Sequence, residues 1–383
     1  MPETIPVPQV SAASAESTVP PVFIVADDLT GACDSAASFL GKAKLVRVIL
    51  NAAGLETPVN LEPATVIAFS TETRNLPRTE AVSAVQQSIL AVRGETPVVI
   101  FKKVDSAGRG YIGAETIAAL GATRASLALV APAFPAAGRT VVRGLLKIRD
   151  SAERESSIPL VTLFSEITTA KIEYLARGTE RALRAAIEAA IDRGTHILLC
   201  DSETQHDLQR LVRAAYPIRQ RLLWTGSAGL AAALASMVPR SDESQQEVGR
   251  WPNGATVLFV GTDHPVTALQ LSHLRQQTRI TDANIQRIDW SVTSAKAVRD
   301  TVHQSPIAAL MLTGGDTAAF VLSALNASAI RIAGELAPGI PWGFIQGGDA
   351  DGRVVVTKSG GFGQPDSLTV AFNFCSRRVC EPA

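Results

Sequence analysis

The stretch VFIVADDLTGACD at residues 22–34 joins an apolar run to an acidic turn and carries the strongest signal for the fold. Val22–Ala26 predicts a buried parallel strand, and the Ala-rich stretch 36–43 predicts a helix after the turn. Three carboxylates and a Thr-Gly turn therefore fall at the carboxyl end of a strand, where open α/β sheets bind their ligands. Ionised carboxylates resist burial unless they are paired, so the adjacent acids indicate a functional site. A solvated turn in which Asp34 caps the helix is the simpler alternative.

The composition favours a two-domain protein without a dominant surface charge. A chain of 383 residues exceeds one ordinary core. Its 36 basic and 36 acidic residues balance, so no overall field attracts nucleic acid or an anionic membrane. No apolar run approaches the ~20 residues of a membrane span, and the N-terminus lacks a secretory pattern. The four cysteines show no CxxC spacing, which argues against zinc and favours a reduced, cytoplasmic protein.

Short β-branched runs alternate with Ala-rich stretches along the chain, which predicts an α/β fold of βαβ units. We expect two α/β domains with mainly parallel sheets and an interdomain cleft. The expected parts are a disordered tail at 1–20, an N-terminal domain at 21–238, a polar linker at 239–253, a C-terminal domain at 254–375 and a tail at 376–383. Strands are expected at 22–26, 45–50, 65–69, 97–103, 126–131, 196–200, 221–225, 255–260, 308–312, 330–335 and 353–357. Helices are expected at 77–93, 113–121, 178–193, 204–214, 227–237, 265–277, 294–302 and 316–325.

A cationic cluster follows another expected strand, in the stretch FKKVDSAGRG at residues 101–110. Cations at a strand end beside a helix start form a site for a carboxylate or phosphate, although exposed lysines at a strand end are the alternative. Arg74 and Arg139 follow other strands and add to this positive edge. The segment 108–113 also matches G-x-G-x-x-G. No acid lies between Glu115 and Asp150 to hold a ribose, which argues against a nicotinamide cofactor.

Glycine-rich turns follow three expected strands in the second half of the chain, at 261–264, 313–317 and 358–363. Glycines at such positions let backbone amides approach phosphate oxygens beside a helix N-terminus. None of the turns matches the Walker pattern. Three of them in one small domain favour a nucleotide site. The turn GSAGL at 226–230 either presents amides to an anion or lets a helix pack closely on a strand.

Taken together, these segments resemble the four-carbon acid sugar kinase family over roughly residues 22–372. The resemblance implies an N-terminal domain that binds an acid sugar and a C-terminal domain that binds ATP. It also implies phosphorylation of the terminal hydroxyl of a substrate such as threonate, erythronate or 3-oxo-tetronate. The matching segments are DDLTGACD (27–34), TETR (71–74), KKVDS (102–106), IGAE (112–115), PAFPAAGRT (132–140), GSAGL (226–230), GGDTA (314–318), PGIPWG (338–343) and VTKSGGFG (356–363).

The resemblance also implies roles for individual residues, with ATP and Mg²⁺ as cofactors and positioning and charge neutralisation as the main sources of catalysis. Either Asp28 or Asp27 would orient or deprotonate the hydroxyl. A homodimer is the expected assembly. The implied catalytic residues are Asp28, Asp27, Asp105 and Arg109; the substrate ligands are Thr30, Arg74, Lys102, Lys103 and Arg139; the nucleotide ligands are Thr262, Gly314, Gly315, Asp316, Thr317, Gly360, Gly361 and Gly363.

Departures from the family pattern keep two other functions open. The family usually reads D-S-T-L-R-G where this chain has residues 105–110, and its G-S-x-S turn is replaced at 261–264. The stretch from Gly261 to Gly314 is also shorter than in the family. These departures motivate a catalytically silent acid-sugar-binding or sensor protein as an alternative. A nicotinamide-dependent oxidoreductase that uses the glycines at 108–113 is the other.

Overall fold

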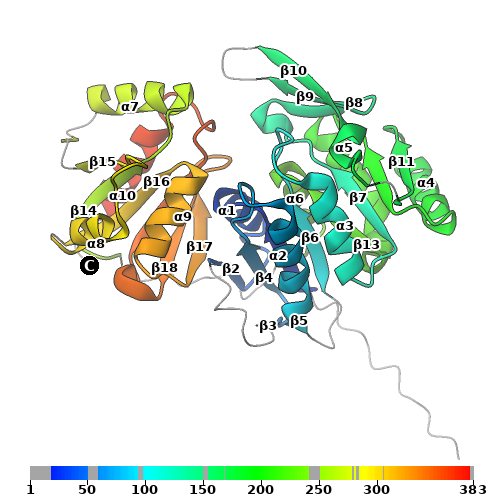
Figure 1. The fold of residues 1–383 in the computed structure, drawn as a ribbon, viewed down its shortest axis with the longest axis horizontal. Helices are drawn as coiled ribbons and strands as arrows, with labels where there is room; N and C mark the ends of the chain where they lie inside the picture. The colour runs from blue at the N-terminus through cyan, green and yellow to red at the C-terminus, as the bar shows by residue number, and fades with distance from the viewer. Residues whose placement is uncertain are drawn as a thin grey trace, which may run out of the picture.

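The structure is a computed structural model in which two α/β halves lie side by side (Figure 1). Most of the expected linker, and nearly all of the expected N-terminal tail, fall outside the residues that it describes. The described residues are 19–50, 59–93, 98–149, 154–167, 169–240, 251–277, 280–281, 284–304 and 306–379.

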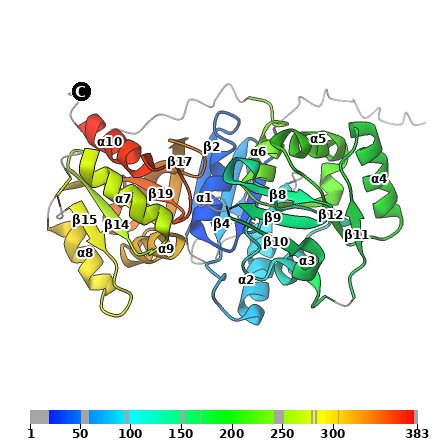
Figure 2. The same cartoon turned by 90° about the horizontal axis from the view of Figure 1, so that it is seen from above.

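A single sheet of 14 strands runs through both halves, with helices on both of its faces (Figure 2). Strand pairing is parallel except around β17 and β18, which confirms the expected α/β class with mainly parallel pairing. In spatial order the strands are β11 (Ile172–Leu175), β12 (Ile197–Cys200), β7 (Leu127–Ala131), β13 (Leu222–Gly226), β6 (Val99–Lys103), β1 (Val22–Ala26), β4 (Thr65–Ser70), β2 (Leu45–Ile49), β17 (Ala329–Glu335), β18 (Pro341–Gln346), β19 (Val354–Lys358), β16 (Ile307–Thr313), β14 (Ala255–Val260) and β15 (Ile285–Arg287).

The two halves are joined edge to edge, because β2 of the first half pairs antiparallel with β17 of the second. In this register Ile330 faces Val48, and Arg331 faces Arg47. The two separate sheets that we expected are thus one continuous sheet. The pairing satisfies backbone groups that two open sheet edges would otherwise leave exposed.

Ten helices cover the sheet in the described part of the chain. Helix α10 continues past residue 375, where we expected the C-terminal domain to end. The helices are α1 (Leu29–Ala37), α2 (Arg78–Ala91), α3 (Ile112–Ala122), α4 (Glu180–Asp192), α5 (Gln205–Ala215), α6 (Ala228–Ala235), α7 (Pro265–Gln277), α8 (Ala295–His303), α9 (Gly315–Ala324) and α10 (Ser367–Val379).

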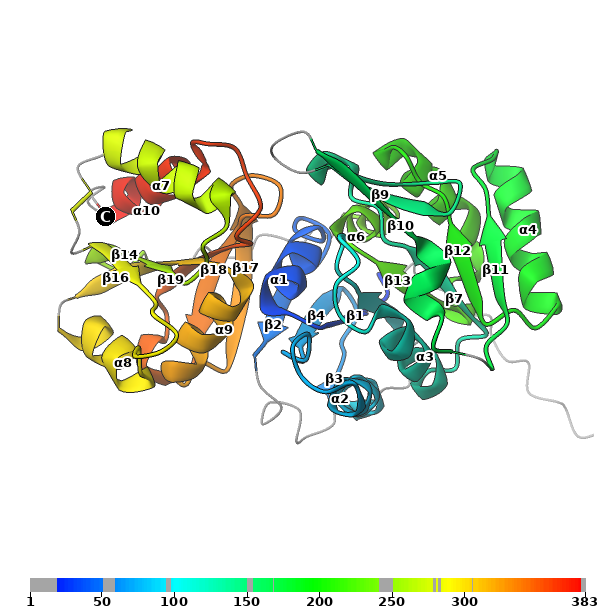
Figure 3. The same ribbon diagram turned by 45° about the horizontal axis from the view of Figure 1, so that its top comes forward.

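Helix α1 begins earlier than expected, directly after Asp28, and ends at Ala37 rather than running through 36–43. Asp28 is its extended N-cap residue, with φ −144° and ψ 155°. Figure 3 shows α1 between the two halves, where it contacts α6 on one side and α9 on the other. Every residue of α1 is buried. Packing on both sides therefore outweighs the weak helix propensity of its Thr-Gly segment.

The first half also contains a small antiparallel sheet, in a stretch of chain where we expected no strands. It comprises β8 (Arg139–Val142), β9 (Leu145–Arg149) and β10 (Glu155–Pro159). Arg143 and Gly144, both with positive φ, form the turn between β8 and β9. Asp201 at the end of β12 holds this turn, since its carboxylate accepts hydrogen bonds from both amides, at 2.8 and 3.0 Å.

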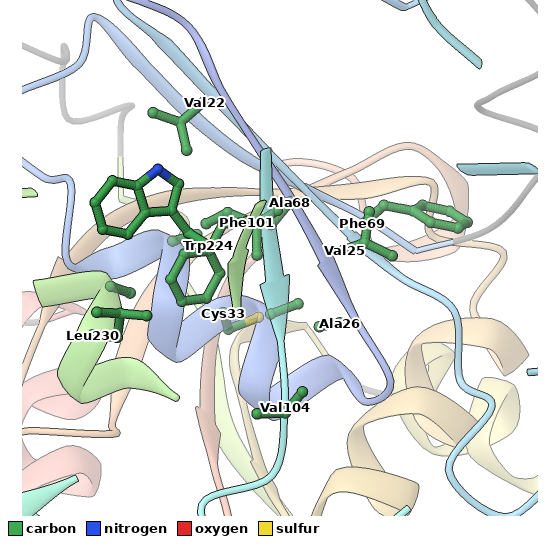
Figure 4. Packing of buried hydrophobic residues seen from close by; sticks show 14 of the residues in the cluster. Val22, Val25, Ala26, Cys33, Ala68, Phe69, Phe101, Val104, Trp224 and Leu230 are labelled. Carbon is green, nitrogen blue, oxygen red and sulfur yellow. The ribbon is translucent and has the colours of Figure 1, made fainter. Parts of the chain in front are cut away.

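The main core cluster surrounds the central strands of the first half (Figure 4) and continues into the second half, where it includes Phe259 and Leu310. All five residues of β1 are buried, as its unbroken apolar run predicts for a parallel strand covered on both faces. Phe101 of β6 and Trp224 of β13 are fully buried in the same cluster. This core makes a rigid base for the loops at the carboxyl ends of the strands. No helix in the described residues is long and apolar enough to span a bilayer.

Candidate active site between the two domains

A pocket that opens to solvent lies between the halves at the carboxyl ends of β1 and β6. Loops of the first half form most of its wall, and two loops of the second half complete it. The pocket combines several charged side chains with two aromatic rings, those of Phe134 and Phe362, whose centroids are 5.9 Å apart. The lining residues are Asp28, Thr30, Gly31, Asp34, Arg74, Lys103, Asp105, Ser106, Arg109, Phe134, Ser227, Ala228, Gly339, Ser359 and Phe362.

Asp28 presents its carboxylate to this pocket instead of capping its own helix. One oxygen, Oδ2, accepts a hydrogen bond from Thr30 Oγ1 at 2.6 Å, and Oδ1 accepts one from Arg74 Nη2 at 2.6 Å. Burial acts to raise the pKa of Asp28, but the positive charges of Arg74 and Lys103 outweigh it and keep that pKa below its usual value. The carboxylate therefore stays ionised at neutral pH and is able to accept a proton.

Asp27 and Asp28 diverge, as adjacent residues at a strand end must. Asp27 does not line the pocket and instead forms a two-point ion pair with Arg74, at 2.7 Å from Nε and 2.9 Å from Nη2. Arg74 thereby directs its main donors to the two aspartates. Arg74 therefore holds Asp27 and Asp28 together and also lines the pocket, where we expected Asp27 to act in catalysis and Arg74 to bind substrate.

The loop at 105–110 is organised by Asp105. Its carboxylate accepts hydrogen bonds from Arg109 Nε and Nη2 at 2.9 and 2.7 Å, and from the backbone amides of Ala107 and Arg109. Burial alone would raise the pKa of Asp105, but the bonds and charge of Arg109 hold it well below its usual value. Gly108 and Gly110 both have φ +81°, which favours glycine at these positions. The loop thus presents Arg109, with 63% of its side chain exposed, at the pocket.

The two consecutive lysines of β6 point to opposite faces of the sheet, as strand geometry requires. Lys103 reaches the pocket, where Gly31 leaves space for it: a Cβ at Gly31 would lie 2.5 Å from both Lys103 Nζ and Asp28 Oδ1. Lys102 is completely buried on the other face and pairs with Glu115 at 2.7 Å. We expected both lysines to bind substrate, but only Lys103 is placed to do so.

Arg139 also lies outside the residues that line the pocket. Its guanidinium stacks over the ring of Phe362, 5.6 Å from the ring centroid. Because Arg139 belongs to the first half and Phe362 to the second, this contact links the two sides of the pocket. We expected Arg139 to be a substrate ligand; in this structure its guanidinium makes a cation–π contact between the domains.

The second half brings its glycine turns against the acidic motif. A Cβ at Gly315, the first residue of α9, would lie 3.2 Å from Asp28 Oδ2. The turns also meet one another around Thr262. Atoms of its side chain lie 3.3 Å from a Cβ placed at Gly314 and 2.7 Å from a Cβ placed at Gly360. The N-terminus of α9, with its unpaired amides and positive dipole end, therefore faces the carboxylate of Asp28.

Unpaired polar atoms mark this edge of the second half. The hydroxyls of Thr313 and Thr317 are buried and have no hydrogen-bond partner among the described residues. Asp316, beside them, lies 3.5 Å from Asn75 Nδ2 of the first half. Unsatisfied buried hydroxyls next to a helix N-terminus fit the oxygens of a bound phosphate. Of the other predicted glycines, Gly361 adjoins His264 of the first glycine turn, whereas Gly363 lies beside Ser367 and Gln270.

Two further residues, one in the pocket and one beside it, were not among the predicted catalytic or binding residues. Lys358, at the end of β19, is buried and donates hydrogen bonds to the carbonyls of Ser359 and Phe362 at 2.8 and 3.1 Å. Burial lowers its pKa to about 7. Asp34 lines the pocket one helical turn after Thr30, and this i, i+4 spacing was the signal available in the sequence.

The substitution Asp34→Asn is expected to change how stability depends on pH. Burial raises the pKa of Asp34 to about 7, against an opposing effect of Lys103. Between about pH 4 and pH 7 the folded protein holds a proton that the unfolded chain has lost, so the free energy of unfolding falls as pH rises. Asparagine does not titrate, so the variant lacks this decline. The free energy of unfolding of the variant, relative to that of wild type, should therefore rise by about 2–4 kcal/mol from pH 5 to pH 8. Urea unfolding at both pH values measures this gain.

The control for this measurement is Asp192→Asn, at an exposed aspartate on α4. As a surface substitution it should leave the free energy of unfolding within about 0.5 kcal/mol of wild type at both pH values. Parallel pH curves for Asp34→Asn and wild type would contradict the raised pKa of Asp34.

Comparison with known proteins places this geometry in a family. One family model, described as a sugar-binding N-terminal domain, matches residues 22–234, and a second, described as a nucleotide-binding C-terminal domain, matches residues 241–368. The chain is 31% identical to a D-threonate kinase of Bordetella bronchiseptica, over 91% of this chain and 96% of that protein. It is 28% identical to a D-threonate kinase of Salmonella typhimurium, over 94% and 99%. It is also 28% identical to a 3-oxo-tetronate kinase of Escherichia coli, over 70% and 72%.

Solved structures share the fold. A Salmonella typhimurium LT2 protein superposes with a TM-score of 0.70 at 19% identity, over 92% of this chain and 98% of that one. Haemophilus influenzae protein HI1011 superposes with a TM-score of 0.64 at 17% identity, over 93% and 100%.

The sugar-binding and nucleotide-binding halves, with a charged pocket between them, define a two-domain phosphotransferase. The chain belongs to the four-carbon acid sugar kinase family, which confirms the resemblance found in its sequence.

Proposed function

We propose that the protein transfers the γ-phosphoryl group of ATP to the terminal hydroxyl of a four-carbon sugar acid, with D-threonate as the first candidate substrate. The observation that carries this proposal is the position of the α9 N-terminus, where the Cβ site of Gly315 is 3.2 Å from Asp28 Oδ2. An anion-binding helix end thus meets an ionised carboxylate. The sugar hydroxyl would bind to Asp28 on the pocket side, and the γ-phosphoryl group beside the adjoining helix N-terminus, so the two reacting groups would be neighbours.

In the proposed reaction, Asp28 accepts the proton of the sugar hydroxyl while the hydroxyl oxygen attacks the γ-phosphorus. A new O–P bond forms, the bond between the γ-phosphorus and the β–γ bridging oxygen breaks, and ADP leaves. Arg74 and Thr30 hold the Asp28 carboxylate in place by their two hydrogen bonds of 2.6 Å. Asp28 both orients the nucleophile and accepts its proton, and the rest of the catalysis comes from positioning and charge stabilisation of the phosphoryl group.

The nucleotide would bind along the glycine turns of the second half. The unpaired hydroxyls of Thr313 and Thr317 and the amides of the α9 N-terminus fit a triphosphate. When bound, Mg²⁺ neutralises the charge that develops on the phosphates. Within the described residues, no group of three His, Cys, Asp or Glu side chains converges to hold a metal. The ion is therefore expected to arrive mainly on the phosphates of ATP, as Mg²⁺ commonly does.

The acid end of the sugar would bind to cations of the first half. Lys103 and Arg109 line the pocket, and the N-terminus of α6 adds amides beside Ser227 and Ala228. Arg74 and Arg109 are both paired with aspartates, but the side chain of Arg74 is 16% exposed and that of Arg109 is 63% exposed, which favours Arg109 as the carboxylate clamp. The substrate carboxylate is therefore assigned to Lys103 and Arg109.

Replacing Arg109 by Ala tests the assignment. Loss of charge-assisted hydrogen bonds should raise the KM for the sugar acid about 10- to 100-fold, with little change in the KM for ATP. ADP release from Mg-ATP, measured across a panel of four- to six-carbon sugar acids, gives both values. Arg109→Lys keeps the charge and should retain part of the affinity. An unchanged KM for the acid in Arg109→Ala would remove Arg109 from the binding site.

The same panel separates the kinase from a silent acid-sugar binder. Turnover with one acid supports the kinase. Calorimetric binding of an acid by a protein that does not bind Mg-ATP would support the binder instead.

A cytoplasmic location and a homodimer complete the proposal. The buried free thiols of Cys33, Cys200 and Cys375 in the described part of the chain suit a reducing compartment, and sedimentation would measure the assembly against the chain mass of 40.3 kDa.

A further inference from the structure

The indole of Trp290 lies at the nucleotide edge of the second half, although no motif in the sequence pointed to it. A Cβ at Gly261 would lie 2.8 Å from Cζ2 of Trp290 and 2.6 Å from Thr317 Oγ1. The ring is therefore next to the first turn of α9 and to one of the unpaired hydroxyls. This places an aromatic surface immediately beside the proposed phosphate site.

The position of Trp290 is held by its neighbours. Its Nε1 donates a hydrogen bond of 2.8 Å to the carbonyl of Gly261, and its ring packs in a T-shaped arrangement on Phe320 of α9, with centroids 5.7 Å apart. The turn that carries it is closed by Asp289, which accepts hydrogen bonds from the backbone and side chain of Ser291 at 2.9 and 2.6 Å. The indole is thus oriented in advance, so a ligand would spend little entropy in ordering it.

Despite these contacts, Trp290 is 54% exposed, in contrast to Trp224 and Trp342, which are 0% and 7% exposed. An indole that has already satisfied its N–H group, but leaves half of its surface in water, offers an apolar face to a ligand. Nucleobases stack on such faces, because each base has a flat aromatic surface of its own. The adjoining helix N-terminus and unpaired hydroxyls supply the anion site that a nucleotide needs at its other end.

We infer that Trp290 is the platform on which the purine base of ATP stacks, with its phosphates at the N-terminus of α9. This inference rests on the proposed function and adds the residue that recognises the base. It predicts that Trp290 contributes to affinity for the nucleoside part of ATP, and not to affinity for the triphosphate.

The test compares ATP with inorganic tripolyphosphate by calorimetry, using the full-length protein without acceptor. In Trp290→Ala, the Kd for ATP should rise about 10- to 100-fold, while the Kd for tripolyphosphate stays at the wild-type value. Trp290→Phe keeps an aromatic face and should bind ATP within a few-fold of wild type. Leu269→Ala removes another exposed apolar side chain, on α7, and should change neither Kd.

Fluorescence gives an independent readout. ATP should protect the exposed indole of the wild-type protein from acrylamide quenching, and this protection should disappear in Trp290→Phe, which retains the fold and the other three tryptophans. Equal ATP affinity in wild type and Trp290→Ala, together with unchanged quenching, would overturn the inference and leave the kinase proposal intact. A wild-type protein that binds neither ATP nor tripolyphosphate would overturn both.

Discussion

Asp28→Asn is expected to reduce turnover about a thousandfold, the largest loss of activity that any single substitution in this pocket should cause. Asparagine cannot accept the proton of the sugar hydroxyl, and it removes the negative charge that Arg74 and Lys103 maintain. The change should appear in kcat, with the KM for ATP little affected, because the side chain acts at the reacting hydroxyl. Steady-state ADP release, together with thermal unfolding to confirm folding, measures it.

Asp27→Asn is the matched control, one residue away on the same loop. Asp27 lies outside the pocket and acts through Arg74, to which it is bonded at 2.7 and 2.9 Å. The expected loss of turnover is about tenfold, because the amide still accepts a hydrogen bond from Arg74 while weakening its hold. A double variant that loses no more turnover than Asp28→Asn alone would show that the pair acts as one unit. Full turnover in Asp28→Asn would remove Asp28 as the proton acceptor.

Lys102→Met is expected to destabilise the protein by about 3–5 kcal/mol while leaving the KM for the sugar acid unchanged. The reason is that Lys102 and Glu115 are a fully buried ion pair at 2.7 Å, and methionine leaves the carboxylate of Glu115 without its counter-charge. Urea unfolding curves and acid KM values measured on the same preparations provide the two numbers. The neighbouring variant Lys103→Met should instead raise the KM for the sugar acid and have a smaller effect on the free energy of unfolding.

A double variant distinguishes the stability lost with the ion pair itself from the stability lost because Glu115 is left buried without a partner. Lys102→Met combined with Glu115→Leu replaces the ion pair with apolar side chains and should recover most of the lost stability. A raised acid KM in Lys102→Met, with wild-type stability, would instead restore Lys102 to the substrate site that its sequence position suggested.

Much of the fold was predictable because its signals are local. The apolar run of β1, the acid-rich turn after it and the glycine turns after β14, β16 and β19 each depend on a few adjacent residues. The small sheet of β8, β9 and β10 was missed because its strands are short and partly polar. Its turn depends on the carboxylate of Asp201, which lies far along the chain. Lys358 and Trp290 were passed over for a similar reason, since their partners are set by packing.

The sequence by itself determined the alternation of strands and helices, the family, and the chemical groups that gather at the strand ends. Those features follow from periodicity, turn chemistry and residue type, and they need no knowledge of distant contacts. Only the tertiary structure decided that β2 and β17 join the halves, that Asp28 rather than Asp27 enters the pocket, and that Lys103 rather than Lys102 reaches it. The physical reason is that adjacent side chains at the end of a strand point to opposite sides. The elements packed on each side then decide which side chain is buried and which one faces the pocket.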